Sequence, residues 1–381
     1  MQNKMLTKKY FLEMVSASIK GSPIPSCPEN ISGELIYKLS VRNAVQGVLY
    51  LAVKSGAITL SAETEAKLQK SYMAILAREA TQQEEIDYIR EAFEKENIEF
   101  MFLKGIHLKS LYPTSQMRFM VDMDILVKEE SMDKGGQLIL ARGFTQEMNN
   151  GKDIVLVKKP FLTIELHKML FVEDYFMHDY FSSVWNRVEK VSDYEYKMPI
   201  NDLYVYTLAH LAEHYLEAGS CFRPLMDLFL MEQKYADLLN FDYINQQFEE
   251  IGIDKFAKKI RQLYKCAFDG AEYNDDLITM ENYIVFGAPV KNADEVAKVA
   301  RTNKSKSKRF IESAFPNLKH MKLKYPILEK APFLLPIFWV VRFFEFVFLK
   351  KGSLEQKQST ITNVDRESAD IMKEIFEKSG F

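Results

Sequence analysis

Two acidic residues inside an apolar segment constrain this chain more than any other feature. Residues 121–127 read VDMDILV, a run of β-favouring residues that predicts a buried strand. Carboxylates are almost never buried unless they are paired or bound to a metal. Asp122 and Asp124 therefore need a partner, or a strand end where both reach water.

The spacing of the two acids favours a shared ion. Side chains two residues apart on a strand point to the same face, and a rise of roughly 3.3 Å per residue places the two Cα atoms roughly 6.6 Å apart. Without a cation the carboxylates of Asp122 and Asp124 would repel, and one would tend to take up a proton. A few oxygen ligands, completed by water and substrate phosphates, are typical of Mg²⁺. The pair therefore predicts a magnesium site, with a solvated strand end as the alternative.

Residues that would complete such a site lie on both sides of the acidic pair. Lys104 and Gly105 close the preceding apolar run, and a glycine there lets the backbone approach a phosphate. Arg118 comes four residues before the first acid. Glu165 and His167 share one face of a later β-like run. Three acids on two strands, a Lys-Gly turn and an arginine are compatible with a two-metal phosphoryl-transfer site.

Patterning along the chain predicts an α+β fold with three parts. Residues 1–96 form an N-terminal helical region, 97–198 a small mixed-sheet core, and 199–381 a C-terminal helical domain. Within the core we expect a strand from near residue 98, a short helix over 106–111, an acid-bearing strand with its approach over 117–127, a helix over 129–142, and strands over 153–158 and 161–168. Asp153 starts one of these strands and is a weaker candidate than Glu165 for the third acid.

Four short motifs in this order resemble a known family. They are L-K-G at 103–105, L-Y-P at 111–113, R-x-x-x-D-x-D-I-L-V at 118–127 and I-E-L-H at 164–167. Together they resemble the uncharacterised bacterial nucleotidyltransferase family of the polymerase-β-like superfamily, over about residues 30–235. The turn departs from the superfamily, which has Gly-Ser or Gly-Gly where this chain has Lys-Gly.

The resemblance assigns roles to these residues. It implies that Asp122 and Asp124 bind metal against a nucleoside triphosphate. Glu165 would be the third carboxylate, either a metal ligand or the base for the acceptor hydroxyl. By the same resemblance the nucleotide would contact a further set of residues: Lys104, Gly105, Arg118, His167, His210, His214 and Arg223.

A second segment that resembles the family is an amphipathic helix over residues 202–216. His210 and His214 are spaced i, i+4 and share a face. The HExxH pattern is absent, so we expect a polar face towards the cleft, or a packed or surface pair, rather than zinc. Arg223 and Asp227 have the same spacing, which indicates a structural ion pair, with a phosphate as the alternative partner of Arg223.

Charge and cysteine content limit the class of protein. The 50 Lys and Arg residues against 53 Asp and Glu residues give a net charge of −3, so any nucleic-acid contact must be a local patch. Three widely spaced cysteines indicate a reducing compartment and no zinc cluster. The N-terminus carries no apolar signal core. We therefore expect a cytoplasmic protein.

Two C-terminal segments carry no motif but stand out in composition. Residues 301–309 contain five basic residues and no acid, which is typical of a solvated loop, with a phosphate or RNA patch as the alternative. Residues 331–349 are the most apolar run. Because Arg342 and Glu345 interrupt it, whereas a membrane span needs about 20 mostly apolar residues, we expect a buried core helix rather than a stable span, with membrane association as the alternative.

These patterns and the resemblance lead to one principal hypothesis. The chain would be a Mg²⁺-dependent nucleotidyltransferase, with Mn²⁺ as a possible substitute, that moves a nucleotidyl group from an NTP to a hydroxyl and releases pyrophosphate. The acceptor, a small molecule, a protein or an RNA end, leaves no signature in the sequence. The rival hypotheses are a non-catalytic nucleotide-binding regulator on the same fold and a membrane-associated scaffold.

Overall fold

The chain forms two compact units. The computed structural model describes residues 2–219, 221–302, 327–341 and 366–381, together with residues 318, 321, 322 and 325. One unit comprises Met1–Glu213, Ser220–Gly287 and Ser379–Phe381, and the other comprises His214–Gly219 and Ala288–Lys378. The sheet lies wholly in the first unit. The division at residues 96 and 198 stays a prediction.

The N-terminal region is helical, as predicted. Its four helices are α1 (Gln2–Ile19), α2 (Gly33–Arg42), α3 (Gln46–Lys54) and α4 (Ala62–Lys95). Helices α2 and α3 are separate because the backbone turns at Ala44, whose φ is 54°. The buried side chain of Asn43 holds this turn by donating to Leu39 O at 2.9 Å and to Val285 O at 3.1 Å.

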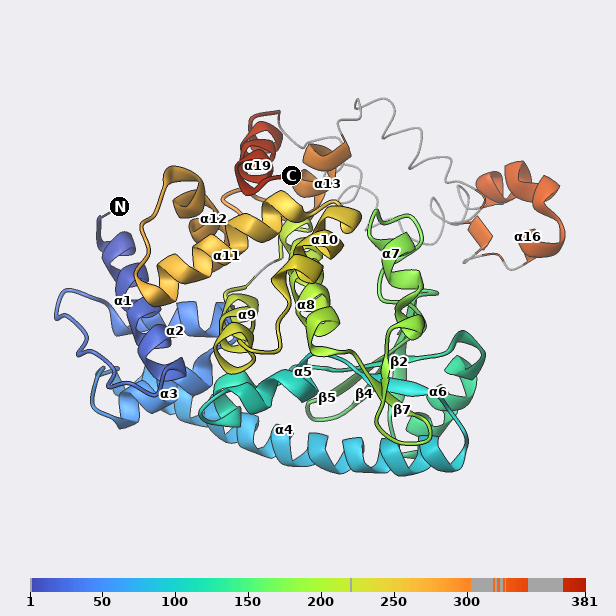
Figure 1. The fold of residues 1–381 in the computed structure, drawn as a ribbon, viewed down its shortest axis with the longest axis horizontal. Coiled ribbons are helices and arrows are strands. Elements are labelled where there is room, and N and C mark those ends of the chain that lie inside the picture. Colours follow the sequence, from blue (N-terminus) through green and yellow to red (C-terminus); the bar gives the residue numbers. More distant parts are fainter. Residues whose placement is uncertain are drawn as a thin grey trace. The chain divides into compact units, whose positions relative to one another are not determined.

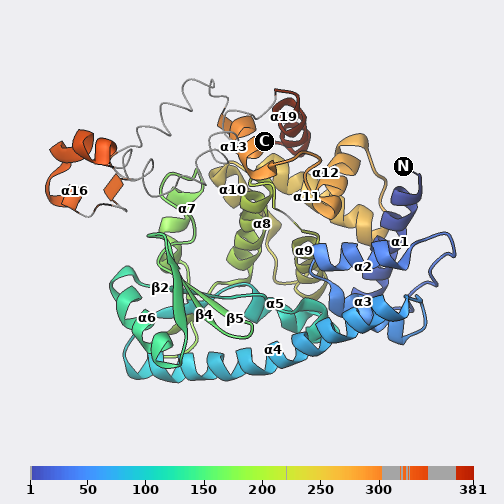
Figure 2. The ribbon, with the colours of Figure 1, turned by 180° about the vertical axis from the view of Figure 1, so that it is seen from behind.

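Helix α4 is the longest element and lies along one side of the sheet (Figure 1). Its N-cap is Ser61, whose hydroxyl accepts from the Thr64 amide at 3.3 Å. Its C-cap is Glu96, and Asn97 follows in the left-handed region with a φ of 56°. The view from behind shows helix α8 (Ile200–Leu216) reaching the sheet from the side opposite α4 (Figure 2).

Seven strands form one mixed sheet, so the α+β fold with a mixed sheet is confirmed. The strand order is β3-β4-β5-β2-β1-β7-β6. The strands are β1 (Phe100–Phe102), β2 (Met123–Val127), β3 (Thr145–Asn149), β4 (Asp153–Lys158), β5 (Leu162–His167), β6 (Glu189–Lys190) and β7 (Glu195–Lys197). Strands β2 and β5 run parallel at the centre, whereas β1 and β4 are antiparallel to their neighbours in this group. The sheet is larger than expected because β3, β6 and β7 were not predicted.

The two faces of the central strands differ in chemistry. On one face Ile125 of β2 and Ile164 of β5 join a buried core with Ile89 and Phe93 of α4. Since side chains alternate along a strand, the residues between them point to the other face. That second face carries Asp124 of β2 together with Glu165 and His167 of β5. Burial of the apolar face against α4 therefore fixes which way the acids point.

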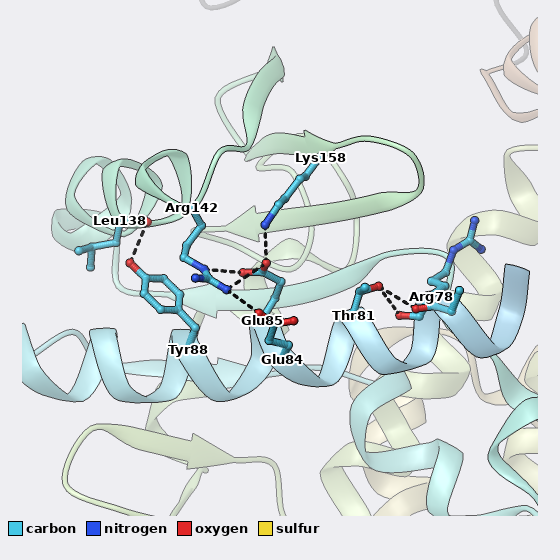
Figure 3. A network of polar contacts seen from close by, with 9 residues as sticks. Arg78, Thr81, Glu84, Glu85, Tyr88, Leu138, Arg142 and Lys158 are labelled. Carbon is cyan, nitrogen blue, oxygen red and sulfur yellow. Dashed lines mark hydrogen bonds and ion pairs between the residues drawn. The ribbon is translucent and has the colours of Figure 1, made fainter.

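An ion cluster ties α4 to the sheet and to α6 (Met132–Ala141). Glu85 of α4 is buried, and its carboxylate accepts from Lys158 Nζ at 2.7 Å and from Arg142 Nε at 3.1 Å. The Tyr88 hydroxyl donates to Leu138 O at 3.3 Å (Figure 3). Arg142 and Lys158 both follow the acid-bearing strand β2 in the chain. Their contacts with Glu85 therefore hold α4 against the sheet.

The other helices lie in the remaining described residues. They are α5 (Gly105–Leu108), α7 (His178–Ser182), α8, α9 (Arg223–Lys234), α10 (Phe241–Ile251), α11 (Asp254–Asp269), α12 (Asp275–Phe286), α13 (Ala293–Thr302), α16 (Ile327–Lys330) and α19 (Arg366–Ser379). The predicted tail helix over 359–381 is described only from residue 366.

The two C-terminal segments with unusual composition are described in part. Of the basic segment 301–309, residues 303–309 lie outside the described residues. In the apolar segment, residues 331–341 are described, and Phe333 and Ile337 are 78% and 57% exposed. The expected buried core helix is therefore wrong for this part, and 342–349 lie outside the described residues. Among the described helices, none is long and apolar enough to cross a membrane.

Candidate active site

The central acid of the motif lies opposite the predicted third acid. Strands β2 and β5 are parallel neighbours, and their register places Asp124 directly beside Glu165 and Leu126 beside His167. Asp124 and Glu165 therefore share the face turned away from α4. The period-two pattern predicted this arrangement, on which the two-strand metal site depends.

Asp122 lies outside the strand to which the sequence assigned it. Strand β2 begins at Met123, and Ser115–Arg118 before it is a 3-10 turn. Gln82 of α4 holds the intervening stretch by donating from Nε2 to Met120 O at 3.3 Å. Burial and the neighbouring Asp124 raise the pKa of Asp122, and they outweigh the cations Lys104 and Arg223. Asp122 is thus an acid that would gain from a cation at this place.

Asp124 is already held by two positively charged partners. His167 Nε2 lies 3.0 Å from its Oδ1, and Lys104 Nζ lies 3.6 Å from its Oδ2. Burial alone would raise the pKa of this carboxyl, but Lys104 and the hydrogen bond from His167 lower it well below its usual range. Lys104 and His167 therefore favour the charged form of Asp124.

His167 connects the acid of β2 to an acid of β4. Its Nδ1 lies 3.6 Å from Asp153 Oδ2, and its Nε2 lies 3.7 Å from Glu165 Oε2. Burial would lower the pKa of His167, but its hydrogen bond to Asp124 and the nearby carboxylate of Asp153 raise it. Contact of His167 with nucleotide stays a prediction; the geometry gives it the task of orienting Asp124. Asp153 lies beside His167, and the choice between it and Glu165 as the third acid stays a prediction.

The donor set of this face fits a metal ion. Asp124, Glu165 and His167 each offer one ligand atom, and these atoms lie within 4.8 Å of one another. Burial and the charges of Asp124 and Asp122 raise the pKa of Glu165, so the acids destabilise one another without a cation. Carboxylate oxygens suit Mg²⁺ and Mn²⁺, whereas an imidazole ligand suits zinc, iron, nickel and copper. The predicted ligand Asp122 is outside this closest group.

The turn at Lys104 and Gly105 is shaped by packing. Lys104 has an unusual backbone conformation, with a φ of 31°, and its ammonium lies 5.4 Å from the centre of the Tyr206 ring. A Cβ at Gly105 would lie 2.8 Å from Cγ and Sδ of Met120. A side chain at this position would therefore displace Met120. Phosphate contact by the two residues stays a prediction.

Arg118 has a structural partner that the sequence did not reveal. Its Nε and Nη2 donate to the two oxygens of Asp227 at 3.0 and 2.9 Å, and the Tyr112 hydroxyl donates to the same carboxylate at 2.6 Å. Both charged residues are buried. The predicted ion pair between Asp227 and Arg223 is therefore wrong. A phosphate contact of Arg118 stays a prediction, although this carboxylate takes two of its donor groups.

Arg223 is oriented towards the acids instead. Its Nη1 donates to Phe119 O at 3.2 Å, and its buried Nε has no hydrogen-bond partner in the described part of the chain. The charge of Arg223 opposes the rise in the pKa of Asp122 without cancelling it. The alternative left open by the sequence, a phosphate partner for Arg223, stays a prediction.

Helix α8 covers the same face of the sheet. The charge of His210 helps to lower the pKa of Asp124, and the His210 ring lies 6.1 Å from that of Tyr206. Burial and the nearby acids raise the pKa of Tyr206 well above its usual value. Sequence reasoning missed Tyr206, because an aromatic residue on an apolar helix face is typical of a core. His214 belongs to the other compact unit, and its role stays a prediction.

Comparison with known proteins gives one match. The model of a family described as "Uncharacterised nucleotidyltransferase" matches residues 29–269. This range spans α2 to α11 and includes the whole sheet. It also includes the three acids Asp122, Asp124 and Glu165 and the arginines Arg118 and Arg223. No curated protein and no solved structure matches the chain.

Proposed function

Because the chain belongs to the family of uncharacterised nucleotidyltransferases, we propose that it moves a nucleotidyl group from a nucleoside triphosphate to a hydroxyl acceptor and releases pyrophosphate. One observation carries the proposal. Asp124 and Glu165 lie directly beside each other on parallel strands, with a third acid two residues before Asp124. In this family context, clustered acids on one sheet face support metal-dependent phosphoryl chemistry.

A divalent cation, Mg²⁺ or Mn²⁺, would be held by Asp124 and Glu165, with Asp122 and His167 as the neighbouring donors. When bound, it would offset the charge of the phosphates and fix the triphosphate in place. Lys104 and His167 keep Asp124 ionised, so this ligand needs no deprotonation before metal binds. Lys104, Arg223 and His210 surround the acids and would contact the nucleotide.

Alternatively, Glu165 would leave metal binding to the other donors and act as the base for the acceptor. Its raised pKa makes it a better proton acceptor than an ordinary carboxylate. The acceptor oxygen attacks the α-phosphorus, and its proton passes to Glu165. The bond from the α-phosphorus to the bridging oxygen breaks, and pyrophosphate leaves with the electron pair.

The first experiment measures Mg-NTP binding by calorimetry for each of the four common nucleotides. Wild-type protein is expected to bind at least one of them, and Asp124→Asn should abolish this binding while circular dichroism shows an intact fold. Asp133→Asn, at an exposed acid of α6, is the matched control. Unchanged affinity in the Asp124 variant would overturn the metal site.

A nucleotide-binding regulator is the second candidate, and one observation favours it. Lys104 and His167 already neutralise Asp124, as they would in a site that binds without turnover. Incubation with labelled NTPs separates the two functions. Pyrophosphate release in the presence of an acceptor supports the enzyme, whereas stoichiometric binding with no release supports the regulator.

A further inference from the structure

An arginine of the N-terminal region is directed to the same site. The guanidinium of Arg78 lies 5.7 Å from the centre of the Phe161 ring, in the turn between β4 and β5. Its Nε is buried and has no hydrogen-bond partner among the described residues. In Figure 3 its side chain extends away from α4 with no contact drawn to the guanidinium, whereas Arg142 and Lys158 both meet Glu85.

The next turn of α4 fixes where this guanidinium lies. The Gln116 amide donates to Glu79 at 2.8 Å, and the Gln82 amide donates to Met120 O at 3.3 Å. Two successive contacts thus hold α4 against the stretch that leads into β2. Asp122 comes two residues later, and its charge partly offsets the burial that lowers the pKa of Arg78.

Arg223 reaches the same stretch from α9, through its bond to Phe119 O. Two arginines from distant parts of the chain therefore flank the approach to Asp122, and each has a buried Nε without a partner. Leaving such a donor unsatisfied costs free energy that a ligand could recover. The planar guanidinium fork matches phosphate oxygens, with which it forms short, charge-assisted hydrogen bonds.

We propose that Arg78 and Arg223 bind the two terminal phosphates of the nucleotide, the part that leaves as pyrophosphate. A cation bound by Asp122 and Asp124 would remove the carboxylates as partners for the arginines. The arginines then need an anion, and a polyphosphate supplies one. The inference rests on the proposed function and extends it by adding Arg78, a residue of the N-terminal helical region.

Inorganic pyrophosphate with Mg²⁺ is the direct probe, because it contains the proposed ligand and no base. Its affinity is measured by calorimetry for wild type, Arg78→Gln, Arg78→Lys and Arg223→Gln. Lys67→Gln, at an exposed position of the same helix, removes one charge and is the matched control. We expect each glutamine variant to weaken pyrophosphate binding at least tenfold, the lysine variant to recover part of the loss, and the control to stay within twofold of wild type.

A second titration separates this role from a structural one. Binding of a nucleoside monophosphate, which lacks the two terminal phosphates, should be equal in wild type and Arg78→Gln, and the two proteins should unfold at the same temperature. Pyrophosphate affinity within twofold of wild type in Arg78→Gln, with wild-type NTP binding intact, overturns the inference alone. Wild type that binds neither pyrophosphate nor any NTP overturns the proposed function as well.

Discussion

Arg118 and Asp227 form a buried, bidentate ion pair between residues 109 positions apart in the chain, with N–O distances of 3.0 and 2.9 Å. The pair joins the approach to β2 to helix α9. It therefore sets the position of Arg223 at the start of that helix relative to Asp122. Its contribution is to hold the two parts of the site together.

Replacing Asp227 with alanine should destabilise the protein strongly. Removal of one partner leaves Arg118 buried and unpaired, which costs about 3–5 kcal/mol. The free energy of unfolding in urea measures this loss. Glu63→Ala, which breaks an exposed ion pair with Lys67, is the control and should leave the unfolding midpoint unchanged. A loss in Asp227→Ala no larger than that of the control would show that the pair is not structural.

Much of this site follows from local patterns, and the rest depends on contacts that no local pattern records. The alternation of apolar and acidic residues is enough to place Asp124 and Glu165 on one face, because burial of the other face decides the orientation. The partner of Arg118 could not be predicted, because Asp227 is brought to it only by tertiary folding. The nearer pair at i, i+4 was the wrong choice for the same reason.

Short or charged segments explain the other differences. Strands β6 and β7 have two and three residues, and they exist only because β1 offers an edge for pairing. Arg78 lies in a segment rich in glutamate and glutamine, where each charge looks solvated until the helix is packed against β2. The sequence predicted Asp122 to be a strand residue. The hydrogen bond from Gln82 to Met120 O instead holds the residues just before Met123, where the strand begins, outside the sheet.

The stability of the metal-free protein should depend on pH through His167. The folded state raises the pKa of His167 above its usual value of about 6.5, so it binds the proton more tightly than the unfolded chain does. This stabilisation is complete below about pH 6.5 and is lost as the pH rises through the folded-state pKa. Unfolding free energies in EDTA should show the difference between wild type and His167→Gln shrinking from pH 6 to pH 9. A constant difference would mean that folding does not shift the pKa of His167, and a growing difference would mean that folding lowers it.

Glu165→Gln should raise the stability of the metal-free protein and lower its activity. The pKa of Glu165 is raised, so its ionised form destabilises the metal-free fold above about pH 4.3, the usual pKa of a glutamate. The amide removes this repulsion, and the melting temperature at pH 7 without metal should rise. Nucleotidyl transfer should fall by about 10²–10⁴-fold because the base is lost. A lower melting temperature with normal turnover would contradict both roles.

Lys104→Met offers a test in which two affinities move in opposite directions. The ammonium lies 3.6 Å from Asp124 and competes with a metal ion for the same carboxylate. Its removal should therefore increase the affinity for Mn²⁺ alone, measured by electron paramagnetic resonance of the free ion. The affinity for Mg-NTP should decrease, because one cation near the phosphates is lost. If both affinities decrease together, Lys104 supports the metal site instead of competing for it. If neither changes, the ion pair with Asp124 contributes nothing to binding, and Lys104 is held there only by its packing against Tyr206.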